Sequence, residues 1–119
     1  MQDNSNCVVQ SCEFSGFCGF AAVHLSDTVR CAVIYNDLHD NYARGIRAYA
    51  HSHKVQVPSF NVIQNNHIYS PINNQGGISA GGFRNVISHN TLEETQIGVE
   101  YGYESIVEKT AVFYSGFST

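Results

Sequence analysis

The apolar positions of this chain recur in a short pattern along most of its length. Each copy begins with a small polar residue or cysteine, has apolar residues two and seven positions later, and places Asn, Thr or Cys at the fifth position. The copies begin at residues 7, 31, 61, 85 and 105, which gives periods of 24, 30, 24 and 20 residues. Periods in this range are typical of stacked supersecondary units.

Within each copy, the apolar spacing predicts two short strands joined by a turn, because the step across the fifth position breaks the alternation of a single strand. The first strands contribute one apolar column: Val9, Val33, Ile63, Ile87 and Val107. The second strands contribute another: Phe14, Leu38, Ile68, Leu92 and Val112. Between them lie Asn36, Asn66 and Asn90. Asparagine tolerates left-handed backbone, so we expect it to form the turn and its amides to hydrogen-bond along a ladder.

A third short strand is predicted downstream of each of four copies, at 23–25, 45–48, 77–80 and 98–101. Three of these strands begin after or at a glycine, which suits a sharp bend into the strand. The chain contains only three leucines and shows no helical periodicity, so a leucine-rich horseshoe is excluded. The absence of a six-residue period disfavours a left-handed hexapeptide helix.

The repeat resembles that of right-handed parallel β-helix proteins, the pectate-lyase-like superfamily, whose repeats read Asn-x-Ile-x-x-Asn-x-Ile followed by Gly-Ile. The resemblance covers residues 6–112, nearly the whole chain. It implies an all-β fold, a right-handed parallel β-helix or β-solenoid of about five coils, with three short strands per coil and an Asn ladder in one turn. The Gly-Ile strands would form the sheet called PB1, and PB2 and PB3 would flank the Asn turn. Residues 113–119 would be a tail or the start of a further coil.

Composition narrows the function classes. The 119 residues suit one domain, and 43% hydrophobic with 13% charged residues indicates a globular chain. A net charge of −4 without a basic patch argues against nucleic acid as a partner. No apolar run approaches the roughly 18 residues of a membrane span. No signal peptide is seen at the N-terminus, whereas the resemblance implies a secreted or cell-surface protein.

Two features concern the ends of the stack. The end coils of a solenoid expose apolar faces and unpaired edges, and no capping helix is predicted here. The chain is therefore expected to be a piece of a longer helix or to self-associate through uncapped ends. The four cysteines are Cys7, Cys12, Cys18 and Cys31. Cys7 and Cys31 hold equivalent repeat positions roughly 5 Å apart, which permits a disulfide, although free buried thiols are favoured.

The outward column of PB1 is the first candidate site. It reads His24, Arg47, Ser79 and Glu100. Neighbouring strands lie roughly 4.8 Å apart, so Arg47 would touch His24 and lie about 10 Å from Glu100. A guanidinium, an imidazole and a carboxylate on one face can bind sugar hydroxyls or a uronate. A solvated sheet face with ordinary charges is the alternative. In the resembled superfamily, substrate lies along PB1 and its flanking loops.

One connection is much longer than the others, at residues 49–59. It leaves the strand that carries Arg47 and contains Tyr49, His51 and His53. Extra length confined to one loop is usually functional or merely tolerated. Two histidines without a third ligand are a weak metal signal, so no metal is predicted.

The turn before PB1 supplies acidic residues. A row of Asp40, then Asn73 or Asn74, then Glu94 would line one rim of the PB1 face. Two carboxylates about 10 Å apart suit an inverting glycosidase better than a retaining one, although solvated turn acids are the alternative.

On PB3, four polar side chains are expected to point outward: Glu13, Asp37, His67 and Thr91. Cross-strand side-chain pairing is sufficient to explain them.

The leading hypothesis is a carbohydrate-active β-helix that binds, and as a glycoside hydrolase cleaves, an extended polysaccharide. Asp40 with Glu94 or Glu100 would be acid and base. Binding would fall to five residues: His24, Arg47, Tyr49, His51 and His53. The PB1 column lacks the clustered Asp of calcium-dependent lyases, so a lyase or epimerase is less favoured, and no cofactor is expected.

Two other classes remain open. One is a non-catalytic glycan-binding or adhesion module, such as a tail-spike or surface-protein fragment, which would use aromatic platforms. The other is a structural fragment without a site.

Overall fold

The computed structural model describes residues 6–16, 18–26, 29–49, 60–69, 77–93, 99–103 and 106–113. Strands are the regular elements in these ranges. The described residues contain no helix that is long and apolar enough to cross a membrane. Several residues of the predicted site and its surroundings lie outside these ranges: His51, His53, Asn73, Asn74, Glu94 and the tail from residue 114.

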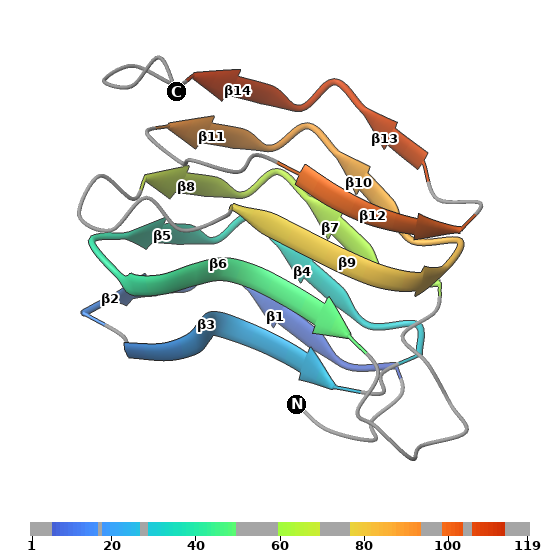
Figure 1. The fold of residues 1–119 in the computed structure, drawn as a ribbon, viewed down its shortest axis with the longest axis horizontal. Helices are drawn as coiled ribbons and strands as arrows, with labels where there is room; N and C mark the ends of the chain where they lie inside the picture. The colour runs from blue at the N-terminus through green and yellow to red at the C-terminus, as the bar shows by residue number, and fades with distance from the viewer. Residues whose placement is uncertain are drawn as a thin grey trace.

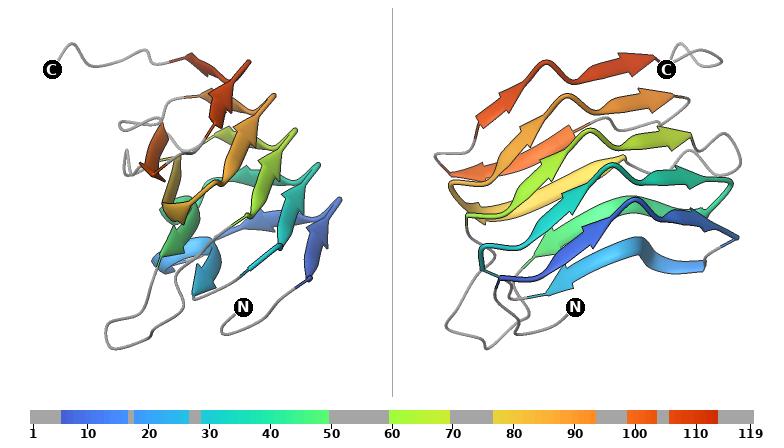
Figure 2. Two further views of the ribbon diagram at one scale, coloured as in Figure 1. Left: turned by 90° about the vertical axis from the view of Figure 1, so that its right-hand side faces the viewer. Right: turned by 180° about the vertical axis from the view of Figure 1, so that it is seen from behind.

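The described strands form three parallel sheets, stacked like a solenoid (Figures 1 and 2). The first sheet contains β1 (Val8–Gln10), β4 (Ala32–Ile34), β7 (Val62–Gln64), β10 (Val86–Ser88) and β13 (Ile106–Glu108). The second sheet contains β2 (Glu13–Ser15), β5 (Asp37–His39), β8 (His67–Tyr69), β11 (Thr91–Glu93) and β14 (Ala111–Phe113). The third sheet contains β3 (Cys18–Ser26), β6 (Tyr42–Tyr49), β9 (Ile78–Phe83) and β12 (Val99–Tyr103).

The strand register confirms the predicted apolar columns. In the first sheet Val33 pairs with Val9 and Ile63, and in the second sheet Leu38 pairs with Phe14 and Ile68. The central members of both columns are buried, with exposed fractions of 0–1%. Successive repeats therefore bury one continuous core, which the apolar residues of the third sheet complete.

The Asn ladder is present at Asn36, Asn66 and Asn90. Asn36 Nδ2 donates to Asn66 Oδ1 over 3.0 Å, and Asn66 Nδ2 donates to Asn90 Oδ1 over 3.0 Å. The backbone N–H groups of Asn36 and Asn66 donate to the same two oxygens. The three amides are buried, and each also donates to a strand carbonyl of the preceding repeat, so the ladder ties neighbouring repeats together.

The predicted left-handed backbone at these asparagines is wrong by one residue. Positive φ occurs instead at the residue just before each of them: Tyr35 (55°), Asn65 (57°) and His89 (56°). Tyr35 is 59% exposed, so its side chain points to solvent. The backbone bends at the preceding residue, and the asparagine then faces inward. Asparagine is therefore explained here by its inward amide hydrogen bonds and not by its backbone preference.

A second ladder occurs at the start of each repeat. The backbone N–H of Cys31 donates to Asn61 Oδ1 over 2.9 Å, and that of Asn61 donates to Asn85 Oδ1 over 3.0 Å. Positive φ again falls one residue earlier, at Arg30, Phe60 and Arg84. Each of these repeats thus has two bends of the same construction.

Gly45 has a different role from the predicted bend. It lies inside β6, and a Cβ added there would meet the Gly77 carbonyl oxygen at 2.7 Å and the Ile68 side chain at 2.9 Å. The third sheet approaches the core too closely at this position for any side chain. The residues 42–44 also belong to β6, so the predicted turn before this strand ends sooner than expected.

The end strands are less buried than the central ones. In β13, Ile106 is 53% exposed and Val107 is 38% exposed, whereas Ile87 of β10 is buried. Self-association through the ends of the stack stays a prediction.

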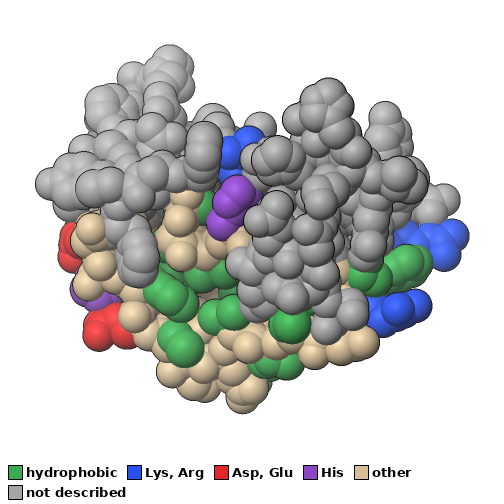
Figure 3. Space-filling model, turned by 90° about the horizontal axis from the view of Figure 1, so that it is seen from below, with side chains coloured by type: hydrophobic (Ala, Val, Ile, Leu, Met, Phe, Trp, Pro, Cys, Tyr) green, Lys and Arg blue, Asp and Glu red, His purple; other side chains and the backbone are tan. Residues whose placement is uncertain are grey.

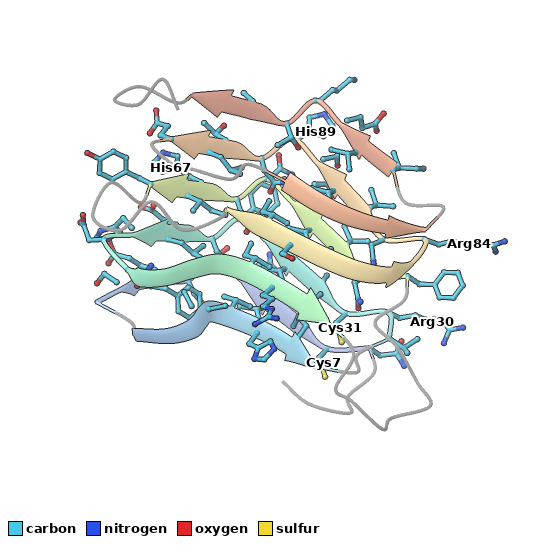
Figure 4. All side chains as sticks on the ribbon, viewed as in Figure 1. Cys7, Arg30, Cys31, His67, Arg84 and His89 are labelled. Atoms are coloured by element: carbon cyan, nitrogen blue, oxygen red, sulfur yellow. The ribbon has the colours of Figure 1, made fainter. Side chains whose placement is uncertain are left out.

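Cys7, Cys12 and Cys31 are free thiols. Burial raises the pKa of the Cys31 thiol. Cys7 and Cys31 come close together in Figure 4, at the equivalent positions that the repeat predicts.

Candidate functional site

The predicted outward column of the third sheet is in register. His24 pairs with Arg47, Arg47 with Ser79, and Ser79 with Glu100. The residues on either side of Arg47, Ile46 and Ala48, are buried. Alternation along the strand therefore places Arg47 on the outer face, and the same holds for His24 between Val23 and Leu25.

Asp40 lies at the end of the second sheet. It has a φ of 54°, and its backbone N–H donates to the Tyr69 carbonyl over 3.1 Å. Its carboxylate contacts the imidazole of His39, with 2.9 Å between Oδ2 and Nδ1. Asp40 is thus held toward the outer face of the second sheet. The backbones of Tyr49 and Glu100 lie in β6 and β12. The catalytic and binding roles proposed for the site residues stay predictions.

The outer face of the second sheet carries a group of titratable side chains, which we call the His–carboxylate cluster. Its members are Glu13, Asp37, His39, Asp40, His67 and Glu93. Figure 4 shows His67 at this edge of the stack. The sequence pattern places three of the six on this face, Glu13, Asp37 and His67, and predicts only ordinary cross-strand pairs for them.

Each histidine of the cluster bridges two carboxylates. His39 Nε2 lies 2.9 Å from Glu13 Oε2, while its Nδ1 lies 2.9 Å from Asp40 Oδ2. His67 Nε2 lies 2.7 Å from Glu93 Oε2, and its Nδ1 lies 3.2 Å from Asp37 Oδ1. Both imidazoles therefore have their two ring nitrogens held by acids.

The register explains these contacts. Asp37 pairs directly with both Glu13 and His67, so these three side chains form one column. The His39–Glu13 and His67–Glu93 contacts are diagonal, two residues beyond the direct partner, which is within reach of long side chains. A His and a Glu separated by the repeat period plus two residues is the sequence signal that would have identified both.

The acids shift the titration of the histidines. Hydrogen bonds to Asp40 and then Glu13 raise the pKa of His39 above its ordinary value. Partial burial lowers the pKa of His67, but hydrogen bonds to Glu93 and Asp37 outweigh it, and the net shift is upward. Both rings are therefore protonated more readily than a free imidazole.

A basic and aromatic group lies at the bends that begin the repeats. The guanidinium carbons of Arg30 and Arg84 lie 5.8 and 6.0 Å from the centre of the Phe60 ring, so both make a cation–π contact with one phenyl group. In Figure 3, acidic side chains lie at one side of the molecule, and basic ones lie both beside an apolar group at the opposite side and next to a histidine nearer the middle.

The chain matches no family model, no curated protein and no solved structure.

Proposed function

We propose that this chain is a right-handed parallel β-helix of five coils, built like the pectate-lyase-like proteins. We propose further that it binds an extended, uronate-containing polysaccharide along the outer face of the third sheet. The support for the architecture is the stack of three parallel sheets with an inward Asn ladder. By the same resemblance, the protein would be secreted or displayed at a cell surface.

The observation that carries the proposed binding is the column of His24, Arg47, Ser79 and Glu100, one residue from each strand of the third sheet. Strands in a sheet repeat at about 4.8 Å, so a linear glycan crossing them would pass one residue of the column at each strand. Arginine binds a carboxylate through two parallel N–H···O bonds, which favours a uronate opposite Arg47. Ser79 beside it can accept from or donate to a sugar hydroxyl.

The proposed function has two versions, a glycoside hydrolase and a non-catalytic binding module. Both would bind the polysaccharide. In the hydrolase version Asp40 with Glu94 or Glu100 would supply acid and base. The contact of Asp40 with His39 places its carboxylate against the second sheet, which favours the binding module over the hydrolase. New reducing ends released from a bound polysaccharide would instead establish the hydrolase.

The test is an array of neutral glucans and uronate polymers, probed with the wild-type protein and Arg47→Ala. We expect saturable binding to at least one uronate polymer, lost in Arg47→Ala. Arg84→Ala is the matched control, since it removes the same charge from a residue that stacks on Phe60, in a different part of the stack. Equal binding by all three proteins, or no binding by wild type to any polymer, would overturn the proposal.

A further inference from the structure

We propose that the outer face of the second sheet is a binding site for a divalent first-row transition-metal ion, with Glu13, Asp37 and His39 as ligands. This site is separate from the polysaccharide face and does not depend on it.

The three ligand atoms have the required proximity. One atom from each of Glu13, Asp37 and His39 lies within 4.8 Å of the other two. Metal bonds from imidazole nitrogen and carboxylate oxygen are about 2.0–2.2 Å long, so atoms around one ion lie less than about 4.4 Å apart. Small rotations of three side chains, two exposed and one partly buried, would therefore bring them around a common centre.

The ligands come from a rigid part of the fold. Glu13 and Asp37 are direct partners on β2 and β5, and His39 is two residues from Asp37 on the same strand and the same face. The backbone positions of all three are thus fixed by one parallel pair of strands. A metal ion here would join two consecutive repeats.

Two of the three proposed ligands, His39 and Asp37, already contact a further side chain of the cluster that would orient them. Asp40 contacts His39 Nδ1, which leaves Nε2, the nitrogen now against Glu13, as the one for the metal. His67 contacts Asp37 and is in turn held by Glu93. Carboxylates that orient a ligating imidazole are typical of metal sites, and their loss usually weakens affinity about 10- to 100-fold.

The charges of the cluster also favour a cation. Glu13 and Asp37 are like charges directly opposite each other on neighbouring strands, an unfavourable pairing by itself. The six residues comprise four carboxylates and two imidazoles, so the cluster stays negative even with both rings protonated. One imidazole with two carboxylates suits Mn²⁺, Fe²⁺, Co²⁺ or Zn²⁺ better than Ca²⁺ or Mg²⁺, which prefer oxygen ligands.

Mn²⁺ is the probe of choice, because it is paramagnetic and because thiols such as Cys12 select softer metals. The ¹⁵N-labelled protein is titrated with Mn²⁺ at about pH 8, above the ordinary pKa of imidazole. We expect saturable broadening of backbone amide signals, centred on Glu13–Ser15 and Asp37–His39. Broadening centred on other residues, or rising linearly without saturation, would overturn the proposal.

Variants then test the ligand set. We expect His39→Ala and Glu13→Gln to abolish the saturable broadening, and Asp40→Asn to weaken the apparent affinity about 10- to 100-fold while the same signals respond. Thr91→Ala, on the outer face of the same sheet, is the matched control and should bind as wild type does. Unchanged Mn²⁺ binding in His39→Ala and Glu13→Gln would show that these residues form only ion pairs. Glycan binding should be the same in His39→Ala, Glu13→Gln and Thr91→Ala, so failure of this site and failure of the polysaccharide face are distinguishable.

Discussion

Replacing Asn66 by alanine should strongly destabilise the stack, because this buried amide connects three repeats. Its Oδ1 accepts from the backbone N and from Nδ2 of Asn36, each over 3.0 Å. Its Nδ2 donates to the Val33 carbonyl over 2.8 Å and to Asn90 Oδ1 over 3.0 Å. Alanine keeps the backbone and removes all four bonds.

The magnitude follows from the groups left behind. The backbone N–H of Asn36 and the carbonyl of Val33 each lose a partner, while Asn36 Nδ2 keeps Val9 and Asn90 Oδ1 keeps the backbone N–H of residue 66. The Val33 carbonyl keeps its place in the β4–β7 ladder, so the Asn36 N–H is the group left unsatisfied. An unsatisfied buried polar group costs about 1–3 kcal/mol, and we expect a loss of about that size. That is a large part of the about 5–15 kcal/mol by which domains are stable.

Urea unfolding followed by circular dichroism measures this loss as a change in the free energy of unfolding. Thr110→Ala is the positional control, because Thr110 holds the place of Asn66 in the end repeat. The Thr110 hydroxyl donates one 3.3 Å hydrogen bond to the Glu108 carbonyl. Its loss should lower the free energy of unfolding by less than 1 kcal/mol, about the net value of one hydrogen bond. Asn66→Asp is a second test, because a carboxyl oxygen then replaces Nδ2, the atom that donates to the Val33 carbonyl and to Asn90 Oδ1. The introduced carboxyl can donate only when protonated, so its pKa should rise above about 3.9 and the variant should lose stability as pH rises from 4 to 7. A loss below 1 kcal/mol in Asn66→Ala, or Asn66→Asp equal to wild type at pH 7, would refute the ladder as a source of stability.

Two further predictions concern the second and third sheets. Because the pKa values of His39 and His67 are raised in the folded state, their ion pairs should stabilise the protein fully below about pH 6.5 and lose this effect as pH rises through the folded values. Urea unfolding from pH 5 to 9, in the presence of a chelator, should show this decline in the free energy of unfolding. The decline should be absent in a His39→Ala/His67→Ala double variant. An identical decline in both proteins would contradict the assignment of the pH dependence to these two histidines. Gly45→Ala should cost about 1–3 kcal/mol, because its Cβ would lie 2.7 Å from a backbone oxygen. Gly81→Ala, whose Cβ would meet nothing closer than 3.8 Å, should be nearly neutral. Equal thermal midpoints for the two variants would show that Gly77 and Ile68 can move away from residue 45 at no cost.

The apolar columns and their register could be predicted from the sequence, because a one-residue slip would turn Val33 and Leu38 out of the core. The same pattern placed His24, Arg47, Ser79 and Glu100 in one column, and the strand pairing shows these four residues in register. The strand register is thus fixed by which side chains are buried, and the spacing of apolar residues in the sequence indicates these positions.

What sequence did not reveal depends on contacts between non-equivalent positions. The bend lies at Tyr35 and not at Asn36, because a tyrosine gives no sign of left-handed backbone. The His39–Glu13 contact is diagonal and therefore falls outside a comparison of matching positions. Gly45 is required because the Gly77 carbonyl of the next repeat lies so close to it. Residues near Gly45 in the sequence give no sign of this contact.

The most direct test of the polysaccharide face is an NMR titration of the labelled protein with a soluble oligouronate. Amide shifts should form a continuous band across the four strands of the third sheet, through Arg47 and its pairing partners, and Arg47→Ala should remove it. Shifts confined to the first or second sheet, or no shift at a saturating ligand concentration, would contradict the proposed function.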